Sequence, residues 1–244
     1  MPTELHNALI TGAGSGIGRA VAESLSALGL RVALVGRDPH KLEETRAALG
    51  VAADSARVEP CDVADRAGVA AMVGRVVDGF GSIDVLVCNA GTNIRQRALG
   101  ELDPADWDRL IATNLTGAFN LVHSALPSMR ARGNGLIVQV ASIAAVRASI
   151  LGGAAYTASK FGQAGLGLTL GREARSWGIR SSVIYPGEVN TPILDARPVA
   201  VGQERRAEVL QPEDVAAAVR FLVELNPRAH VPELVIKPTV DDWS

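Results

Sequence analysis

The chain has 244 residues, of which 48% are hydrophobic but only 4% aromatic, and its formal net charge at pH 7 is −2. This near-neutral balance, without a long run of Lys or Arg, gives no electrostatic reason to expect a nucleic-acid or membrane-surface partner. The length suits one domain with a large core, and we expect a single domain over residues 1–244. A core of Ala, Val, Leu and Ile suits parallel strands that are buried on both faces.

Short apolar runs alternate with amphipathic segments along the chain. Seven of these runs are predicted to be strands: 7–11, 31–35, 56–59, 83–88, 136–140, 181–184 and 233–237. Helical patterns lie between successive strands, and the helix before the last strand is expected to begin near Pro212, a proline followed by two acids. This alternation predicts an α/β fold with a doubly wound, mostly parallel seven-stranded sheet and helices on both faces.

The residues from Thr11 to Gly18 read Thr-Gly-Ala-Gly-Ser-Gly-Ile-Gly, and they join the first predicted strand to a helix with an apolar stripe. Glycines at such a turn let the backbone approach a pyrophosphate, and the free N–H groups at the helix start bind the anion. The spacing is neither Gly-x-Gly-x-x-Gly nor the Walker pattern, which argues against an ATPase. The residues expected to contact the phosphates are Gly12, Ser15, Gly16, Ile17 and Gly18.

Cys61 and Cys88 each end a predicted buried strand, so we expect core thiols and a reducing compartment rather than a disulfide. The four histidines are scattered without the spacing of metal ligands, and no metal is expected. Close to Met1 the chain enters an apolar strand without a basic region and a signal segment, and it has no apolar span of about 18 residues. The sequence is therefore interpreted as that of a cytoplasmic protein.

Tyr156 and Lys160 are four residues apart, which places a phenol and an ammonium on one helical face. A cation held there stabilises the phenolate of a tyrosine that otherwise titrates near ~10, and it lowers the barrier to proton transfer. Taken alone, the same spacing is equally typical of a packed ring beside a solvated amine. Further along, the segment 191–210 contains Pro192, Pro198 and Gly202, and it suits a lid over a substrate. An ordinary surface connection is the alternative for this segment.

Several motifs occur in one order along the chain: Thr-Gly-x-x-x-Gly-x-Gly at 11–18, Cys-Asn-Ala-Gly at 88–91, Asn114, Ser142, Tyr156-x-x-x-Lys160 and Pro186-Gly187. Together they resemble the short-chain dehydrogenase/reductase family, and the resemblance extends from about residue 7 to residue 191. It implies a Rossmann-type fold and an NAD(P)-dependent oxidoreductase that interconverts a carbonyl and a secondary alcohol of a small substrate. A homodimer or homotetramer is expected by the same resemblance.

The resemblance also implies the catalytic roles. Tyr156 would be the general acid or base toward the substrate oxygen, and Lys160 would lower the pKa of the phenol and hold the ribose hydroxyls. Ser142 would donate a hydrogen bond to the substrate oxygen. Asn114 would shape a local helix distortion and bind a water that links Lys160 to solvent, and a helix-starting cap is a compatible alternative for Asn114.

The end of the second strand bears on the choice of dinucleotide. An acid that closes this strand favours NAD, but here Gly36 is followed by Arg37, whose guanidinium is available to a 2′-phosphate. In similar family members this arrangement implies NADP(H) rather than NAD(H). Asp38, which precedes Pro39, is interpreted as a helix cap rather than as the ribose-binding acid. The remaining contacts that the resemblance implies for the cofactor are Asp62, Val63, Asn89, Ala90, Gly91, Pro186, Gly187, Val189 and Thr191.

Three arginines, Arg95, Arg97 and Arg147, fall on segments that border the substrate pocket in similar proteins. We hypothesise that one of them pairs with a substrate carboxylate. Solvated loop arginines or subunit contacts are the alternative. The C-terminus lacks the Val-Asp-Gly-Gly ending common among ketoacyl-carrier-protein reductases, so a 3-oxoacyl thioester is kept only as the alternative substrate class. A catalytically silent NAD(P)-binding regulatory or scaffold protein is the alternative function.

Overall fold

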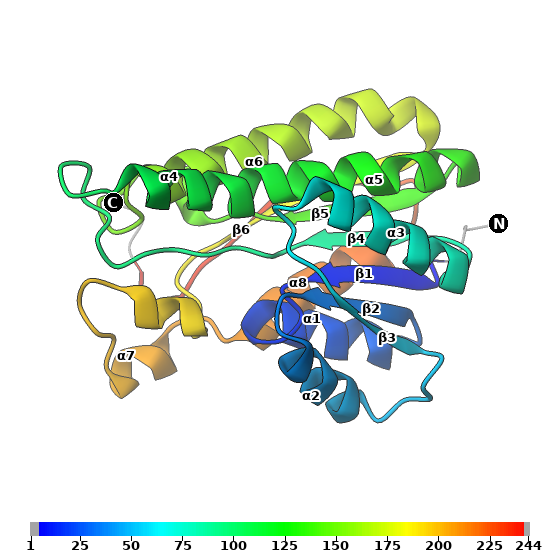
Figure 1. The fold of residues 1–244 in the computed structure, drawn as a ribbon, viewed down its shortest axis with the longest axis horizontal. Coiled ribbons are helices and arrows are strands. Elements are labelled where there is room, and N and C mark those ends of the chain that lie inside the picture. Colours follow the sequence, from blue (N-terminus) through cyan, green and yellow to red (C-terminus); the bar gives the residue numbers. More distant parts are fainter. Residues whose placement is uncertain (1–4, 242–244) are drawn as a thin grey trace.

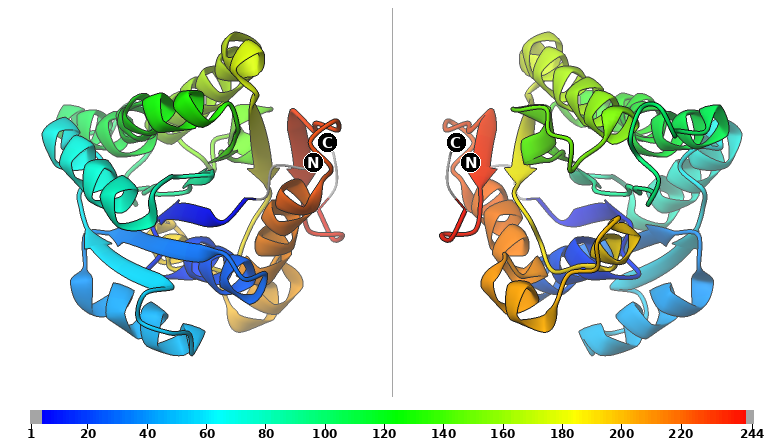
Figure 2. Two further views of the ribbon diagram at one scale, coloured as in Figure 1. Left: turned by 90° about the vertical axis from the view of Figure 1, so that its right-hand side faces the viewer. Right: turned by 90° about the vertical axis from the view of Figure 1, so that its left-hand side faces the viewer.

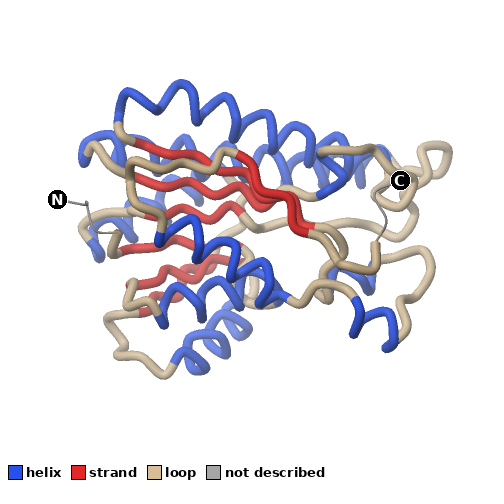
Figure 3. The backbone as a smooth tube through the Cα atoms, turned by 180° about the vertical axis from the view of Figure 1, so that it is seen from behind, coloured by secondary structure: helices blue, strands red, loops and turns tan. Residues whose placement is uncertain are grey.

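The computed structural model describes residues 5–241, and within them seven parallel strands form one sheet in the order β3-β2-β1-β4-β5-β6-β7 (Figures 1 and 3). The strands are β1 (Asn7–Thr11), β2 (Arg31–Gly36), β3 (Ala56–Pro60), β4 (Val85–Cys88), β5 (Gly135–Val140), β6 (Ile179–Pro186) and β7 (Glu233–Ile236). Each predicted strand is present with both ends within two residues of the prediction, and every pairing in the sheet is parallel. The predicted doubly wound α/β fold is therefore confirmed.

Helices cover both faces of this sheet, as Figure 2 shows along the strands. The α-helices are α1 (Gly16–Ala27), α2 (Pro39–Leu49), α3 (Arg66–Phe80), α4 (Pro104–Ile111), α5 (Gly117–Arg132), α6 (Ala154–Glu173), α7 (Gln203–Glu208) and α8 (Pro212–Glu224). One apolar cluster packs α1 and α8 against the sheet, and a second cluster packs α3, α5 and α6 against the opposite face. Successive side chains of β1 point to opposite faces of the sheet, so Ile10 belongs to the first cluster and Leu9 to the second.

Acidic side chains fix the starts of three helices. Asp38 accepts hydrogen bonds from the backbone N–H groups of His40 and Lys41, so its predicted role as the cap of α2 is confirmed. Asp65 and Asp103 cap α3 and α4 in the same way. The prediction for Pro212 is also confirmed, since α8 begins at this proline behind a capping box.

The centre of the sheet is a topological switch point. From β1 the chain runs outward through β2 and β3, and it then crosses back to β4 on the other side of β1. Open α/β sheets bind ligands at such a point, beyond the carboxyl ends of the strands.

Within the described part of the chain, no helix is both long and apolar enough to cross a membrane.

The side chain of Thr11 joins the two halves of the sheet at this point. Its buried hydroxyl donates to the carbonyl of Val87 at 3.1 Å and accepts the backbone N–H groups of Asn89 and Ala90, each at 3.0 Å. The side-chain amide of Asn89 donates back to the Thr11 carbonyl at 2.9 Å. These bonds hold the turn after β1 against the turn after β4.

We expect Thr11→Val to lower the free energy of unfolding by about 2 kcal/mol, because two backbone N–H groups lose their acceptor. Urea denaturation measures this loss. Thr11→Ser keeps the hydroxyl and removes only a methyl group, so its cost should be about 0.5–1 kcal/mol. Equal losses for the two variants would show that the hydroxyl does not join the turns.

Candidate active site

The glycines after β1 form a cradle that fits an anion at the start of α1. Gly12 and Gly16 have φ angles of +69° and +50°, a region that favours glycine. A Cβ at Gly18 would lie 2.2 Å from the Gly12 carbonyl oxygen, so only glycine permits this contact between helix and turn. Ser15 precedes the helix without a side-chain capping bond, which leaves the N–H groups of the first turn to a ligand. These features fit the pyrophosphate of a dinucleotide.

A cleft runs along the carboxyl ends of the strands from α2 to α6, and it has two regions. The first has a volume of about 750 Å³ and the second about 950 Å³. The predicted cofactor residues that line the first region are Gly12, Ser15, Arg37, Asp62, Val63, Ala90 and Gly91. The predicted residues that line the second are Gly12, Ser15, Gly16, Ile17, Asn89, Ala90, Gly91, Ser142, Tyr156, Lys160, Pro186, Gly187, Val189 and Thr191. Two predicted residues, Gly18 and Asn114, line neither region and lie behind it.

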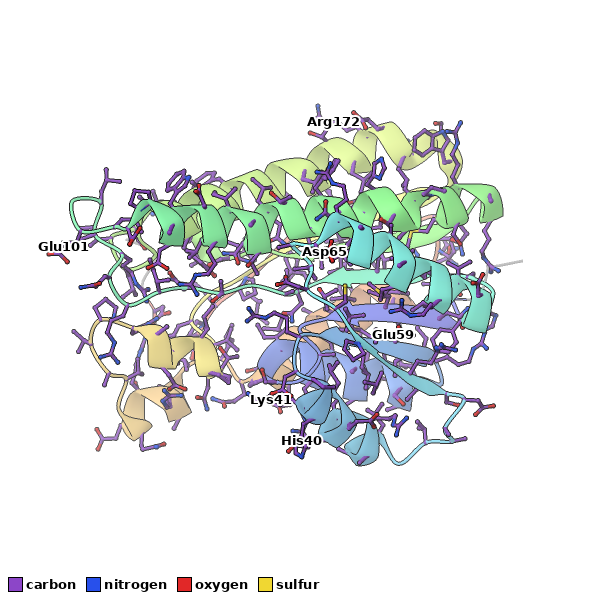
Figure 4. The ribbon with its side chains drawn as sticks, viewed as in Figure 1. His40, Lys41, Glu59, Asp65, Glu101 and Arg172 are labelled. Atoms are coloured by element: carbon purple, nitrogen blue, oxygen red, sulfur yellow. The ribbon has the colours of Figure 1, made fainter. Side chains whose placement is uncertain are left out.

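Lys41 is a cation of the first region that the sequence did not single out. It belongs to the first turn of α2, where Figure 4 labels it beside His40. A Cβ at Gly14 would lie 3.0 Å from the Lys41 Cβ, so the glycine loop and this helix turn are in contact. Arg37 lines the same region. A second cationic residue four positions after Arg37, in the first turn of the predicted next helix, was the available signal for Lys41.

Tyr156 lies in the first turns of α6 and reaches the second region of the cleft. Burial raises the pKa of its phenol above the ordinary value of 10, whereas a hydrogen bond with Ser142 and the positive charge of Arg97 act in the opposite direction. Ser142 follows β5, and its hydroxyl also accepts the backbone N–H of Ala144 at 3.1 Å. The structure thus brings the predicted phenol and hydroxyl together.

Lys160 is buried on the same helix, one turn beyond Tyr156. Its Nζ donates to the Val140 carbonyl at 3.0 Å and to the Gln163 side chain at 2.8 Å, and it lies 5.8 Å from the centre of the Tyr156 ring. Burial lowers the pKa of Lys160 to about 8. The ammonium is directed to these two acceptors, and Arg97 is the cation that lowers the phenol pKa here, so acidification of the phenol by Lys160 stays a prediction.

Asn114 lies in the middle of a π-helical turn, Ala112–Thr116, that joins α4 to α5. Its side chain is fully buried, accepts the N–H of Thr92 at 2.8 Å and donates to the Thr92 carbonyl and to the Ser159 hydroxyl, each at 3.0 Å. The predicted local distortion of the helix is present. The alternative, a helix-starting cap, is wrong because the helical turns continue on both sides of Asn114.

The two ends of the segment 191–210, which is predicted to be a lid, lie side by side. Val189 and Leu210 form a parallel bridge, and the N–H of Asn190 donates to the Leu210 carbonyl at 2.8 Å. Between them the chain forms a short 3₁₀ turn, Pro192–Ala196, and α7, the gold and orange segment of Figure 1. Several of its residues line the second region of the cleft: Thr191, Pro192, Ile193, Leu194, Ala196, Arg197 and Arg205. A segment anchored at two adjacent points suits a moving cover, and its role as a lid stays a prediction.

The three candidate arginines differ in their surroundings. Arg97 is buried and lines the second region, where Arg147 also lies, whereas Arg95 is exposed and lines neither region of the cleft.

No group of three or more His, Cys, Asp or Glu side chains within residues 5–241 is arranged to hold a metal ion.

Comparisons with known proteins agree with this geometry. The chain matches the model of the family described as short chain dehydrogenase over residues 6–200. A curated relative, cis-4-hydroxycyclohexanecarboxylate dehydrogenase of Sinomonas cyclohexanicum, is 36% identical over 220 residues, which cover 88% of each chain. A solved metagenomic short-chain oxidoreductase in complex with NADP is 32% identical with a TM-score of 0.84, covering 98% of this chain and 100% of that one. A 3-ketoacyl-(acyl-carrier-protein) reductase from Brucella melitensis, complexed with NADH, is 28% identical with a TM-score of 0.87, covering 96% and 97%.

The buried ammonium of Lys160 makes a testable contribution to stability. Because burial lowers its pKa from 10.5 to about 8, the unfolded chain binds more protons than the folded chain between these two pH values. We expect the unfolding free energy of the parent, minus that of Lys160→Met, to rise by roughly 1 kcal/mol per pH unit in this window. Denaturant unfolding at several pH values measures the difference. Lys41→Met, at an exposed lysine, is the control, and a difference independent of pH would contradict the buried position of the ammonium.

Proposed function

Because the chain belongs to the short-chain dehydrogenase/reductase family, we propose that it uses NADP(H) to interconvert a carbonyl and a secondary alcohol of a small substrate. Membership of this family, whose named relatives are dehydrogenases and reductases, makes it an NAD(P)-dependent oxidoreductase. The observation that carries the proposal is the phenol of Tyr156, which lines the same region of the cleft as Ser142 and Lys160, beside the glycine cradle.

In the reducing direction, Tyr156 donates its proton to the substrate oxygen and Ser142 stabilises the charge that develops there. When bound, the nicotinamide supplies or accepts the hydride. In the oxidising direction Tyr156 must act as a phenolate, a form that burial disfavours and that Arg97 and Ser142 favour.

Lys160 is proposed to hold the ribose hydroxyls, as the family pattern implies. Its support is the position of Gly91, where an added Cβ would lie 3.5 Å from both the Lys160 Nζ and the Asn114 side-chain oxygen. Gly91 and Lys160 both line the second region of the cleft, so a hydroxyl-bearing ligand bound there would lie close to the Lys160 Nζ. Asn114 acts behind this point, because its side chain fixes the backbone of Thr92 and the hydroxyl of Ser159. Asn114 is therefore proposed as a positioning residue for the α6 face that carries Tyr156 and Lys160.

The preference for NADP(H) is proposed on the charges at the end of β2. Arg37 and Lys41 both line the first region of the cleft, whereas the carboxylate of Asp38 is engaged as the cap of α2. Asp38 and Asp62 also line this region, but the Asp38 carboxylate is bonded to the N–H groups of α2, and the two cations suit a 2′-phosphate. The remaining cofactor residues are proposed to line the adenine and nicotinamide ends as the family pattern implies.

A homodimer or homotetramer is proposed on the outer faces of α5 and α6. Phe119 on α5 and Phe161 on α6 are 39% and 44% exposed, although aromatic side chains of this size are normally covered.

A cytoplasmic location is proposed on the two free thiols, Cys61 and Cys88, which persist in a reducing compartment.

Removal of the phenolic hydroxyl tests the proposed reaction. We expect Tyr156→Phe to lower kcat at least about 100-fold, because the general acid is lost, while the affinity for NADPH stays close to that of the parent. Nicotinamide absorbance with a panel of small ketones and oxo acids measures the rate, and fluorescence titration measures the affinity. Tyr185→Phe is the matched control, since the Tyr185 hydroxyl bonds Glu233 outside the cleft. Unchanged turnover by Tyr156→Phe would sink the proposed function.

The choice of dinucleotide is tested separately at Arg37. We expect Arg37→Ala to weaken NADPH binding by about 10- to 100-fold and NADH binding by less than about threefold, because only NADPH carries the 2′-phosphate. Arg46→Ala on the same helix α2, where the side chain pairs with Glu43, is the control. An equal loss for both dinucleotides would remove the basis for the assignment to NADP(H).

A further inference from the structure

Arg97 is an unusual cation for the wall of a substrate cleft. Only 7% of the residue is exposed, and it lies in the loop between β4 and α4. One Nη donates to the carbonyl of Leu151 at 2.7 Å, and the other donates to the carbonyl of Ala196 at 2.5 Å. The buried Nε has no hydrogen-bond partner. A guanidinium has five N–H donors, so beside the buried Nε and these two carbonyl contacts one N–H on each Nη remains for a ligand.

No carboxylate within residues 5–241 pairs with Arg97, although a buried cation normally requires such a partner. The neighbouring cations do have partners. Arg197 pairs with Glu188 at 2.8 Å, and Arg205 pairs with Glu188 at 2.8 Å and with Asp241 at 2.5 Å. Each Glu188 oxygen thus lies 2.8 Å from a nitrogen of another arginine, and the charge of Arg97 is not neutralised by the described chain.

Among the lining residues that the structure describes, cations outnumber acids in the second region of the cleft. Its cationic lining residues in the described part of the chain are Arg97, Arg147, Lys160, Arg197, Arg205 and Lys237, and its acidic lining residues are Glu188 and Asp241. The complete chain, by contrast, has a net charge of −2. A cleft with more cations than acids, in a protein of net negative charge, attracts anionic ligands.

The position of Arg97 is rigid and close to the reacting groups. Gly153, with a φ angle of +77°, precedes α6, and a Cβ there would lie 2.6 Å from the Arg97 Cβ. The stem of Arg97 is therefore packed against the start of the helix that carries Tyr156, three residues further on. The charge of Arg97 acts on the phenol itself.

We infer that the substrate is a short oxo acid or hydroxy acid whose carboxylate is bound by Arg97 while its carbonyl or hydroxyl carbon faces Tyr156. This inference rests on the proposed function and names the substrate class of the same site. The carboxylate supplies the missing counter-charge, and it displaces no acid of the protein because none is paired with Arg97. The apolar lining residues between the polar groups, Ile143, Ala144, Ile193 and Leu194, suit a short hydrocarbon body.

Binding of unreactive probes tests this inference without turnover. Cyclohexanecarboxylate and pentanoate, each compared with its carboxamide, are titrated by calorimetry into the full chain saturated with NADP⁺. We expect the parent to bind at least one of the carboxylates about tenfold more tightly than its amide. In Arg97→Gln the carboxylate should bind about 10- to 100-fold more weakly and the preference over the amide should fall below about threefold.

Arg95→Gln is the matched control, because it removes an exposed arginine from the same loop and should leave the preference intact. Arg97→Lys keeps the charge but loses the planar group with two Nη donors. We expect this variant to retain part of the preference for the carboxylate over its amide. The melting temperature of each variant separates loss of folding from loss of binding. Equal affinity of acid and amide for the parent, binding of neither, or an undiminished preference in Arg97→Gln would each overturn the inference.

Failure of the proposed function gives a different result. If the chain bound carboxylates through Arg97 but neither bound NADP⁺ nor turned over any oxo acid, the reaction would be wrong and the anion site would stand. If it reduced neutral ketones as well as oxo acids, with equal losses in Arg97→Gln, the reaction would stand and the substrate class would be wrong. The ratio of kcat/KM for levulinate to that for its methyl ester distinguishes these cases.

Discussion

The close contact between the turns after β1 and β4 is the constraint on which the remaining site depends. Thr11 bonds three backbone groups of the β4 end, and the Gly18 backbone lies so close to Gly12 that no side chain fits between them. This contact opens the cleft at the switch point of the sheet and sets the phosphate cradle at one edge of it. Tyr156 and Lys160 on α6 line the same region of the cleft as this cradle.

Burial governs the chemistry of the cleft. It raises the pKa of Tyr156 and lowers that of Lys160, so both shifts favour the uncharged form. The groups that oppose the shift of the phenol are Ser142, which follows β5, and Arg97, which follows β4. The pKa of the Tyr156 phenol therefore depends on residues that follow two different strands, and the guanidinium that lowers it is the one without a counter-charge among the described residues.

The local parts of the site could be predicted because each depends on neighbouring residues. The glycine spacing at 11–18 predicts a backbone turn, and the cap at Asp38 follows from an acid before a proline. Tyr156 and Lys160 share a helical face by their spacing alone. The direction of the Lys160 ammonium did not follow from that spacing, because its acceptors are Val140 on β5 and the Gln163 side chain. The tilt of an ammonium toward a buried amide depends on which strand packs beneath the helix.

The sequence by itself determined the doubly wound sheet, the cradle and the order of the catalytic residues, since hydrophobic period and motif spacing are properties of short segments. Only the tertiary structure decided among the three candidate arginines. Arg97 bonds Leu151 and Ala196, which are 54 and 99 residues away along the chain, and no local pattern contains those separations. The same holds for the contact of Lys41 with the glycine loop. Burial of a charge and the absence of a partner for it are properties of the packed chain, because they depend on every segment that closes around the site.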